Sequence, residues 1–326
     1  MDQYDIIIIG AGPTGISCAI EAKKNGLSTL IIEKGMLTNS IYNFPTNMTF
    51  FSTSLNLEIG DVPFISHNEK PTRIEALEYY RRVIDKWDLE IIFREEAHSI
   101  QESTNDQLQV NTISNGAYLA DNIVVATGFY DTPRKLNVPG ENLPKVKHYY
   151  DDVHPYIKQK VLVVGAANSA CDVALETWSK GAEVTMAVRS AELYERVKYW
   201  ILPNIKNRIK EGSIKAYFNS TVKMINTDSV VLDTPEGEIT IDNDYVLAMT
   251  GYTPNYELLA RFGIEWDDTD LQIPLFDEDT LESTRKGVYL AGVVNGGLHT
   301  SRYFIENTRE DGEKIIRDIL LKTSIT

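Results

Sequence analysis

Hydrophobic residues in the first 33 positions form two short continuous runs separated by a stretch with helical spacing. Residues 5–9 are an apolar, largely β-branched run, which predicts a strand buried on both faces. A glycine-rich stretch at 10–15 interrupts it, and residues 16–24 are predicted to form a helix that ends near Gly26. Residues 27–33 return to strand character. The pattern predicts a strand-loop-helix-strand unit.

The same pattern restarts near the middle of the chain. Residues 160–164 are predicted to form a buried strand, 165–170 a tight loop, and 171–180 a helix stopped by Gly181. The following run, 183–188, is again strand-like. One supersecondary unit is therefore predicted to occur twice at long range.

The rest of the chain is predicted to add a helix, a small antiparallel insertion and irregular segments. Residues 73–87 have helical periodicity, with Leu77, Tyr80 and Ile84 on one face. Three short strand-like runs follow, and their length is typical of an antiparallel insertion. These runs are 90–93, 109–113 and 122–125; further on, strands are predicted at 245–249 and 287–292 and a helix at 305–321, whereas 40–63 is predicted to be irregular and 129–156 to be a connection.

These elements predict an α/β protein with two Rossmann-like dinucleotide-binding domains, each with a parallel sheet, and small antiparallel insertions. The chain length of 326 residues suits two domains. We expect a discontinuous first domain at 1–130 plus 255–326, whose dinucleotide is identified below from its loop, and a second dinucleotide-binding domain at 157–250. Residues 131–156 and 251–254 are predicted to connect them.

The first loop has the spacing of a dinucleotide-binding fingerprint. Gly10, Gly12 and Gly15 fit G-x-G-x-x-G between a strand and a helix. In this pattern the glycines allow a tight turn, close approach of a pyrophosphate and close helix–strand packing. Glu33, at the end of the next strand, can accept hydrogen bonds from ribose hydroxyls. A glycine-rich turn with a solvated Glu is the alternative, but the order of elements favours a nucleotide, here FAD.

The second loop is a degenerate copy, in which alanines replace the second and third glycines after Gly165. Its position between a buried strand and a helix supports it. The next strand ends at Arg189, and Arg196 and Lys198 follow. Because cations there suit a 2′-phosphate, NADPH is preferred to NADH. A solvated basic turn is the alternative.

Composition excludes several classes of protein. The formal net charge of -15 argues against general nucleic-acid binding. The N-terminus does not resemble a signal peptide, and no apolar run reaches the length of a membrane span. Cys18 and Cys171 cannot form a disulfide framework. We therefore predict a cytoplasmic protein that binds neither nucleic acid nor membrane.

Cysteines and histidines offer few candidates for chemistry. Each cysteine lies early in a predicted helix, where a buried small side chain is the simpler interpretation, although a helix N-terminus can lower the thiol pKa of Cys18. No metal site is predicted, because the five histidines lack metal-ligand spacing. Only His299, close to Gly296 and Gly297, lies near a predicted flavin-side loop.

With these motifs established, the chain resembles the flavoprotein superfamily with two dinucleotide-binding domains that includes thioredoxin reductase. Residues 126–128 and 250–254 resemble its two crossover segments, and 287–292 resembles its C-terminal flavin motif. Over essentially the whole chain it is most similar to the YpdA-type bacillithiol disulfide reductases. The stretches that carry this likeness are 49–52, 143–146, 200–204 and 304–307. The resemblance implies FAD, NADPH and a low-molecular-weight thiol disulfide as substrate.

The chain departs from these relatives at three places. It has no C-x-x-C, so a dithiol relay to thioredoxin is not expected. Val293 stands where the superfamily often has an Asp that meets the flavin ribityl chain. Thr14 stands where the YpdA-type group often has Cys, and threonine cannot form a mixed disulfide. Either reduction proceeds directly from flavin, or Cys18 substitutes, or the substrate is not a disulfide; Thr14 and Cys18 are the only catalytic candidates.

The leading hypothesis is an NADPH-dependent FAD oxidoreductase that reduces a small disulfide such as bacillithiol disulfide. The alternatives are a ferredoxin or flavodoxin reductase, a flavin monooxygenase and an NADPH-sensing flavoprotein, and a homo-oligomer stays open. The residues predicted to contact cofactors are Gly10, Gly12, Pro13, Thr14, Gly15, Glu33, Lys34, Tyr42, Phe51, Thr53, Ala97, Thr127, Gly128, Gly165, Ala167, Asn168, Ser169, Arg189, Lys198, Gly251, Gly292, Val293, His299 and Thr300.

Overall fold

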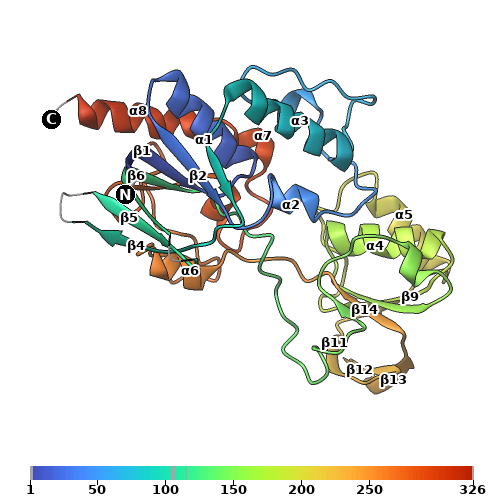
Figure 1. Cartoon of the computed structure of the whole chain (residues 1–326). Coiled ribbons are helices and arrows are strands. Elements are labelled where there is room, and N and C mark those ends of the chain that lie inside the picture. Colours follow the sequence, from blue (N-terminus) through green and yellow to red (C-terminus); the bar gives the residue numbers. More distant parts are fainter. Residues whose placement is uncertain (1–2, 104–106, 115, 325–326) are drawn as a thin grey trace. The chain divides into compact units, whose positions relative to one another are not determined.

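The computed structural model describes residues 3–103, 107–114 and 116–324, and the chain forms two compact units (Figure 1). Unit 1 comprises Met1–Thr132 and Tyr252–Thr326, and unit 2 comprises Pro133–Gly251. Both contain a sheet with parallel strands and helices packed on it; in unit 1 this sheet also carries antiparallel strands, and unit 2 adds a separate small antiparallel sheet. The predicted α/β class is confirmed. Within the described residues, no helix is both long and apolar enough to span a bilayer.

Unit 1 is built on a seven-stranded mixed sheet. Its parallel part contains β1 (Gln3–Ile9), β2 (Thr29–Glu33), β3 (Ile91–Phe93), β6 (Ala117–Val125) and β15 (Val288–Leu290). β1 lies between β2 and β6, so Ile8 pairs with both Ile31 and Val124. β15 pairs with β6, which brings the C-terminal part of the chain into the sheet.

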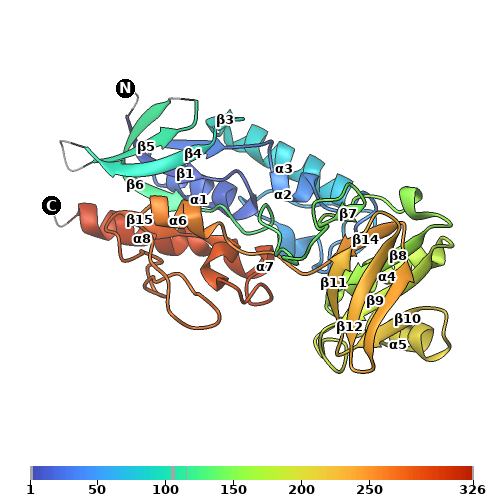
Figure 2. The same cartoon turned by 90° about the horizontal axis from the view of Figure 1, so that it is seen from below.

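The antiparallel insertion differs from the predicted one. β3 is not part of it, because it pairs parallel to β2 at the sheet edge. The third antiparallel strand is β4 (Ala97–Glu102), which pairs with β5 (Leu108–Thr112), and β5 pairs with the first half of β6 (Figure 2). In β4 only Ala97 and Ile100 are buried. Its weak alternation of apolar and polar residues explains why the sequence did not reveal it.

Alternate side chains of β1 enter two different cores, as strand geometry requires. Ile6 and Ile8 pack with α1 (Pro13–Lys24) and α8 (Asp311–Thr323), which lie side by side in Figure 1. Ile7 and Ile9 pack with α6 (Tyr256–Arg261) on the opposite face. The first glycine loop therefore begins at the end of a strand that is fixed from both sides.

Two segments of unit 1 differ from their predicted secondary structure: one contains short helices where none was predicted, and the other has two helices in place of one. The irregular stretch 40–63 overlaps a short helix, α2 (Asn39–Tyr42), and contains a 3-10 turn, η1 (Leu55–Leu57). The predicted single helix at 305–321 is two helices, α7 (Ile305–Thr308) and α8. The break follows from contacts of residues 308–312 with distant segments, described below. Other elements of unit 1 are α3 (Arg73–Trp87) and η3 (Gly292–Gly296).

Unit 2 has a five-stranded parallel sheet in the order β10-β9-β8-β14-β7. Its strands are β7 (Val146–Lys147), β8 (Lys160–Val164), β9 (Glu183–Val188), β10 (Lys215–Phe218) and β14 (Tyr245–Ala248). The stretch 129–156, predicted as a connection, thus supplies an edge strand and a turn, η2 (His154–Tyr156).

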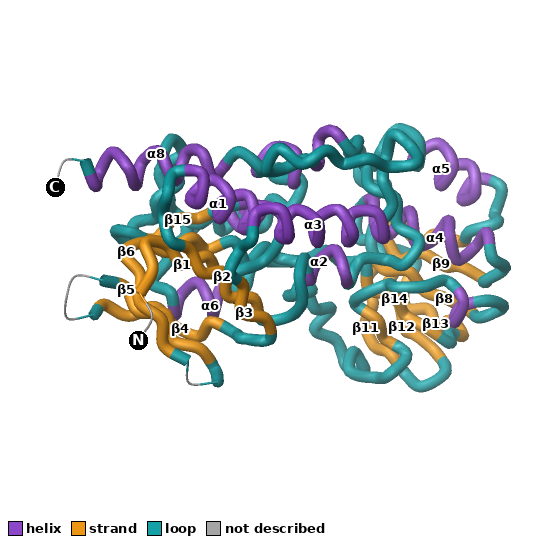
Figure 3. Tube along the Cα trace, turned by 45° about the horizontal axis from the view of Figure 1, so that its top comes forward, coloured by secondary structure: helices purple, strands orange, loops and turns teal. Residues whose placement is uncertain are grey.

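Two helices and a second sheet complete unit 2 (Figure 3). The helices are α4 (Asn168–Ser179) and α5 (Leu202–Lys210). The second sheet is an antiparallel meander of β11 (Thr221–Ile225), β12 (Ser229–Thr234) and β13 (Gly237–Asp242). One core lies under α4 and α5, and another lies between the parallel sheet and the meander.

Candidate functional site

Two glycines of the first loop are required by the fold itself. Gly10 has a φ of +114°, and a Cβ there would lie 2.5 Å from the carbonyl oxygen of Ala126. A Cβ on Gly15 would overlap the carbonyl oxygen of Gly10. The loop therefore turns tightly between β1 and α1, as the fingerprint predicts.

Gly12 has a different environment. It is the N-cap of α1, and no described heavy atom outside its chain neighbours lies within 4 Å of the position a Cβ would take. The first turn of a helix carries amide groups without intrahelical acceptors and the positive end of the helix dipole. Open space beside such amides fits the pyrophosphate of a dinucleotide. The residues present thus fit FAD at this loop.

Glu33 lies at the end of β2 with its carboxylate held by two backbone amides. Its Oε2 accepts a hydrogen bond from Ala11 N at 2.8 Å, and its Oε1 accepts one from Gly35 N at 2.7 Å. Burial raises the pKa of this carboxyl above its usual range, while the two amides oppose that effect. Each carboxylate oxygen has further acceptor capacity, so ribose hydroxyls can donate to it.

The structure brings the C-terminal flavin motif predicted from sequence next to the first loop. Gly292 follows β15 with a φ of +86°, and a Cβ there would lie 3.1 Å from Thr14 Oγ1. Gly128 follows β6 with a φ of +67°, and its Cβ position lies 3.7 Å from Val293. These residues meet at the carboxyl ends of β1, β6 and β15, where ligands of open α/β sheets bind.

Neither catalytic candidate is presented as a nucleophile. Thr14 Oγ1 lies 3.0 Å from Thr308 Oγ1. Cys18 is fully buried in the core under α1, and burial, followed by the nearby Asp311 charge, raises its thiol pKa. Cys171 is also buried, and burial raises its thiol pKa to about 12. Both cysteines are free. A thiol that keeps its proton at neutral pH and lacks access to solvent is unreactive.

The remaining predicted residues of unit 1 are more scattered. Lys34 pairs with Asp131 at 3.0 Å. Exposed Tyr42 lies under the guanidinium of Arg73, 5.4 Å from the ring centroid. Ala97 is buried in β4, paired with Thr112. The others are Pro13, Thr53, Thr127, His299 and Thr300, which are half-buried, and Phe51, which is at the border of exposure.

The second loop repeats the strain of the first. Gly165 has a φ of +137°, and a Cβ there would lie 2.5 Å from the carbonyl oxygen of Met249, at the end of the neighbouring strand. Ala167 is the N-cap of α4, and Ser169, in the first turn, is exposed. Gly251 has a φ of +87° and open space at its Cβ position among the described residues. This loop fits a second nucleotide.

A basic and aromatic segment, residues 189–201, folds back over the second loop. Asn168 Oδ1 accepts a hydrogen bond from Lys198 N at 2.9 Å, and Ala166 O accepts one from Tyr194 N at 3.0 Å. Arg189 is exposed at the end of β9. The same segment carries exposed Tyr194 and Tyr199, which were not predicted as site residues. Their closeness in sequence to Arg196 and Lys198 was the signal that could have identified them as candidates.

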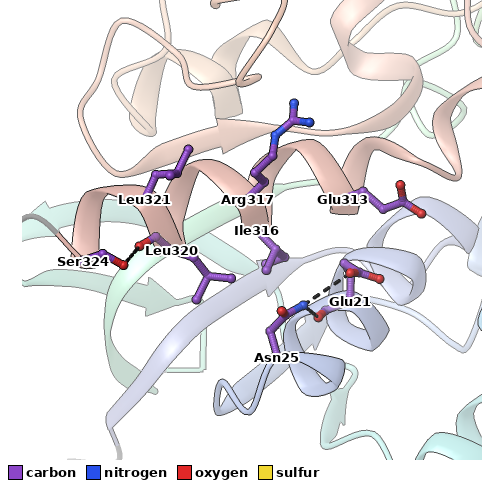
Figure 4. A pocket seen from close by; sticks show the side chains of 8 residues that line it. All are labelled: Glu21, Asn25, Glu313, Ile316, Arg317, Leu320, Leu321 and Ser324. Carbon is purple, nitrogen blue, oxygen red and sulfur yellow. Dashed lines mark hydrogen bonds between the residues drawn. The ribbon is translucent and has the colours of Figure 1, made fainter.

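One open groove of about 310 Å³ lies on unit 1 away from the glycine loop. Figure 4 shows it between the C-terminal part of α1 and α8. Its lining residues are Glu21, Asn25, Glu313, Ile316, Arg317, Leu320, Leu321 and Ser324. None of them was predicted to bind a cofactor. Among the residues that the structure describes, no group of three His, Cys, Asp or Glu could hold a metal.

Comparison with known proteins gives a consistent result. Residues 7–292 match the family model described as pyridine nucleotide-disulphide oxidoreductase. The chain is 43% identical over 320 residues to bacilliredoxin reductase Bdr of Bacillus subtilis, an alignment that covers 98% of both chains.

Solved structures agree with this. Bacillithiol disulfide reductase Bdr (YpdA) from Staphylococcus aureus matches with a TM-score of 0.94 and 40% identity over 99% of each chain. The thioredoxin reductase of T. acidophilum matches with a TM-score of 0.75 and 20% identity, and covers 100% of each chain. The second likeness concerns the fold alone, and it agrees with the predicted two-domain Rossmann-like architecture.

Proposed function

The chain belongs to the pyridine nucleotide-disulphide oxidoreductase family, and from this premise we propose that it uses NADPH and FAD to reduce a bacillithiol-type disulfide. Membership makes it a flavin-dependent oxidoreductase. The observation that carries the finer proposal is the pair of strained glycine loops, one in each unit. The similarity to bacillithiol disulfide reductases adds the substrate class.

We assign FAD to unit 1. Gly12 and the first turn of α1 would hold the pyrophosphate, and Glu33 would accept hydrogen bonds from the ribose. Gly128 and Val293 would lie along the remainder of the cofactor, because they follow the neighbouring strands of the same sheet edge. The bound flavin supplies hydride and electron transfer; the chain binds and orients it.

We assign NADPH to unit 2. The first turn of α4 would hold its pyrophosphate, and Arg189 would pair with the 2′-phosphate. Lys198 is fixed near the same loop by the bond of its amide to Asn168, and Tyr194 is fixed by its bond to Ala166. This packing keeps a cationic segment over the nucleotide loop.

The proposed reaction does not use a protein thiol. The two cysteines of the chain are buried, lie in different units and do not form a disulfide. Thr14 directs its hydroxyl at Thr308. The substrate disulfide must therefore be reduced at the flavin without a mixed disulfide to this chain, which sets the proposed enzyme apart from relatives with a C-x-x-C.

Two acceptors deserve direct comparison. One is a low-molecular-weight disulfide of the bacillithiol type, because the Staphylococcus aureus relative is named bacillithiol disulfide reductase. The other is a disulfide carried on a bacilliredoxin, because the Bacillus subtilis relative is named bacilliredoxin reductase. We propose that the reaction occurs in the cytoplasm, which the free cysteines of the chain support.

Anaerobic titration tests the proposal. NADPH should bleach the bound flavin, and either disulfide should restore its absorbance in a stoichiometric amount. Flavin that NADPH does not bleach would refute the reductase. Faster reoxidation by ferredoxin or flavodoxin would favour a ferredoxin or flavodoxin reductase, and faster reoxidation by oxygen with a substrate would favour a monooxygenase. Slow reoxidation by all acceptors would favour a sensor.

A variant tests the preference for NADPH. Arg189→Ala should raise the KM for NADPH roughly tenfold or more and leave the KM for NADH nearly unchanged, since one charged contact to the 2′-phosphate is removed. Lys210→Ala, an exposed change in the last turn of α5, is the matched control. An unchanged ratio of the two KM values would remove Arg189 from the nucleotide site.

A further inference from the structure

Residues 308–312, which run from the end of α7 to the start of α8, contact the first glycine loop, the beginning of α1 and the turn at Gly292. We call this segment the brace. It comes from a part of the sequence separated by 294 positions from Thr14, which it contacts. None of its residues was predicted to take part in the site.

Asp311 is the buried charged residue of the brace. Its Oδ2 accepts a hydrogen bond from Gly292 N at 2.8 Å, and its exposed fraction is 8%. Gly292 is the residue whose left-handed backbone brings the flavin-side turn against Thr14. The bond therefore fixes the turn from behind, and a charged acceptor makes it stronger than a neutral bond.

Thr308 is the second buried polar residue of the brace, and hydrogen counting gives the direction of its bond. The Thr308 hydroxyl donates to Phe304 O at 2.8 Å, which uses its one hydrogen. The hydrogen between Thr308 Oγ1 and Thr14 Oγ1 therefore comes from Thr14. Thr14 can then only accept a hydrogen bond from a ligand.

Two further brace residues, Arg309 and Gly312, fix the backbone. Arg309 O accepts a hydrogen bond from Ser17 in α1, and its guanidinium donates to Leu55 O at 2.9 Å. Gly312 packs so closely that a Cβ there would lie 2.9 Å from Cys18 Cα. The brace thus contacts α1 along its first two turns, and the first of these would hold the pyrophosphate.

We propose that the brace is a positioning device for the flavin, in which Asp311 and Thr308 lock the Gly292 turn and Thr14 into the geometry that binds the cofactor. This rests on the proposed FAD site of unit 1. Asp311 and Thr308 act through Gly292 and Thr14, so they are positioning residues. Without them, the loop would still form but would hold flavin less tightly.

The test measures flavin affinity of the whole chain by fluorescence, with the visible absorption bands of bound flavin as a second readout. Asp311→Ala should weaken FAD binding roughly tenfold or more, since a buried amide loses a charged acceptor, and should shift the bands. Asp311→Asn should restore affinity to within about threefold, because an amide oxygen accepts the same bond. Glu313→Ala, exposed in the same helical turn, is the control and should change nothing.

A second pair covers the case in which Asp311→Ala does not fold. Thr308→Val and Thr14→Val keep side-chain shape and remove one hydroxyl each. Each should weaken FAD binding several-fold, and the double variant should lose no more than the worse single one, since both remove the same bond. The proposal would be overturned if Thr308→Val binds FAD as tightly as the wild type and the Asp311 variants also fail to support it. They fail if Asp311→Ala binds FAD as tightly as the wild type, or if Asp311→Asn does not restore the affinity that Asp311→Ala loses. A wild-type chain that binds no FAD would instead refute the proposed function.

Discussion

Gly12 and Gly15 belong to one motif, but a side chain would meet different surroundings at each position. A Cβ on Gly15 meets the backbone of Gly10, whereas a Cβ on Gly12 meets open space among the described residues. We expect Gly15→Ala to lower the free energy of unfolding by about 1–3 kcal/mol through overpacking. Gly12→Ala should lower it by less than about 1 kcal/mol and yet reduce FAD affinity strongly.

Chemical denaturation and flavin fluorescence on both variants separate these effects. Equal losses of stability would mean that Gly12 is limited by packing. Undiminished flavin binding in Gly12→Ala would mean that the pyrophosphate does not approach at this residue.

The carboxyl of Asp311 makes stability depend on pH. Burial raises its pKa from 3.8 to about 6, although the Gly292 amide and Lys314 oppose the rise and Glu310 adds to it. Cys18 and Tyr303 also face this carboxyl. The folded chain thus holds this proton more tightly than the unfolded chain, so the carboxyl costs stability as pH rises from about 4 to about 6.

Asp311→Asn removes this cost. The gain in unfolding free energy of the variant over the wild type should grow by about 1–3 kcal/mol between pH 4.5 and pH 7.5, since one pKa unit corresponds to about 1.4 kcal/mol. Denaturant melts of the flavin-free protein at several pH values give the measurement. Parallel pH profiles of the two proteins would show that Asp311 titrates normally.

The thiols of Cys18 and Cys171 should be unreactive in the native protein. Cys18 and Cys171 are buried and their pKa values are raised. A thiol reagent such as Ellman's should find no reactive group within minutes, and two after unfolding. Cys18→Ala and Cys171→Ala should each keep disulfide turnover within about twofold. A tenfold loss in either variant that still binds flavin would return that cysteine to the mechanism.

At the scale of elements, the packing of α1 on α8 depends on one small residue. The Cβ position of Gly312 lies 2.9 Å from Cys18 Cα, and backbone cannot move aside as a flexible side chain can. Gly312→Ala should therefore destabilise the chain by about 1–2 kcal/mol, even though alanine favours helices. Thermal melts against Glu313→Ala, a neighbouring exposed change, would detect this; a stabilised Gly312→Ala would contradict the close packing.

Elements whose signals are local could be predicted from the sequence. The bounds of α3 agree with the prediction because Thr72 and Glu75 form a capping box at its start. β8 and β9 agree because continuous β-branched runs end in glycine or arginine. β4 was missed, since its buried residues are few, and β10 to β13 were missed because short, partly exposed strands carry a weak pattern.

The site could be predicted only in part, for the same reason. The glycines and Glu33 lie within one supersecondary unit, so their spacing makes them candidates for the proposed site. The break between α7 and α8 and the proposed role of Asp311 depend on contacts between distant segments, such as that of Thr308 with Thr14. A periodic pattern in the sequence of α8 extends through this break and conceals it.

At the scale of the whole molecule, backbone hydrogen bonds within each unit join the two chain segments at which the chain passes from one unit to the other. In unit 2, Arg134 N donates to Gly251 O at 3.0 Å, and in unit 1, Thr253 N donates to Thr132 O at 2.9 Å. Residues 133–251 should therefore fold alone, with cooperative melting and retained affinity for NADP⁺. A chain that joins Thr132 to Tyr252 through a short glycine linker should keep FAD but resist bleaching by NADPH.

Circular dichroism and nucleotide titration of the two pieces check this prediction. Residues 133–251 that melt without cooperativity would show that their cores need the rest of the chain. FAD binding by that piece, or bleaching of the linked piece by NADPH, would reverse the assignment of cofactors to units.

The pairing of β15 with β6 orders events during protein synthesis. Unit 1 cannot complete its central sheet until Val288–Leu290 has left the ribosome, and its brace follows later still. Unit 2 is continuous and is fully translated before those residues emerge. Since domains generally fold as units while the chain grows, unit 2, in the middle of the chain, completes first, and the first 132 residues await their C-terminal partner. A chain truncated before Val288 would thus expose an unfinished sheet edge and be a substrate for chaperones or proteases.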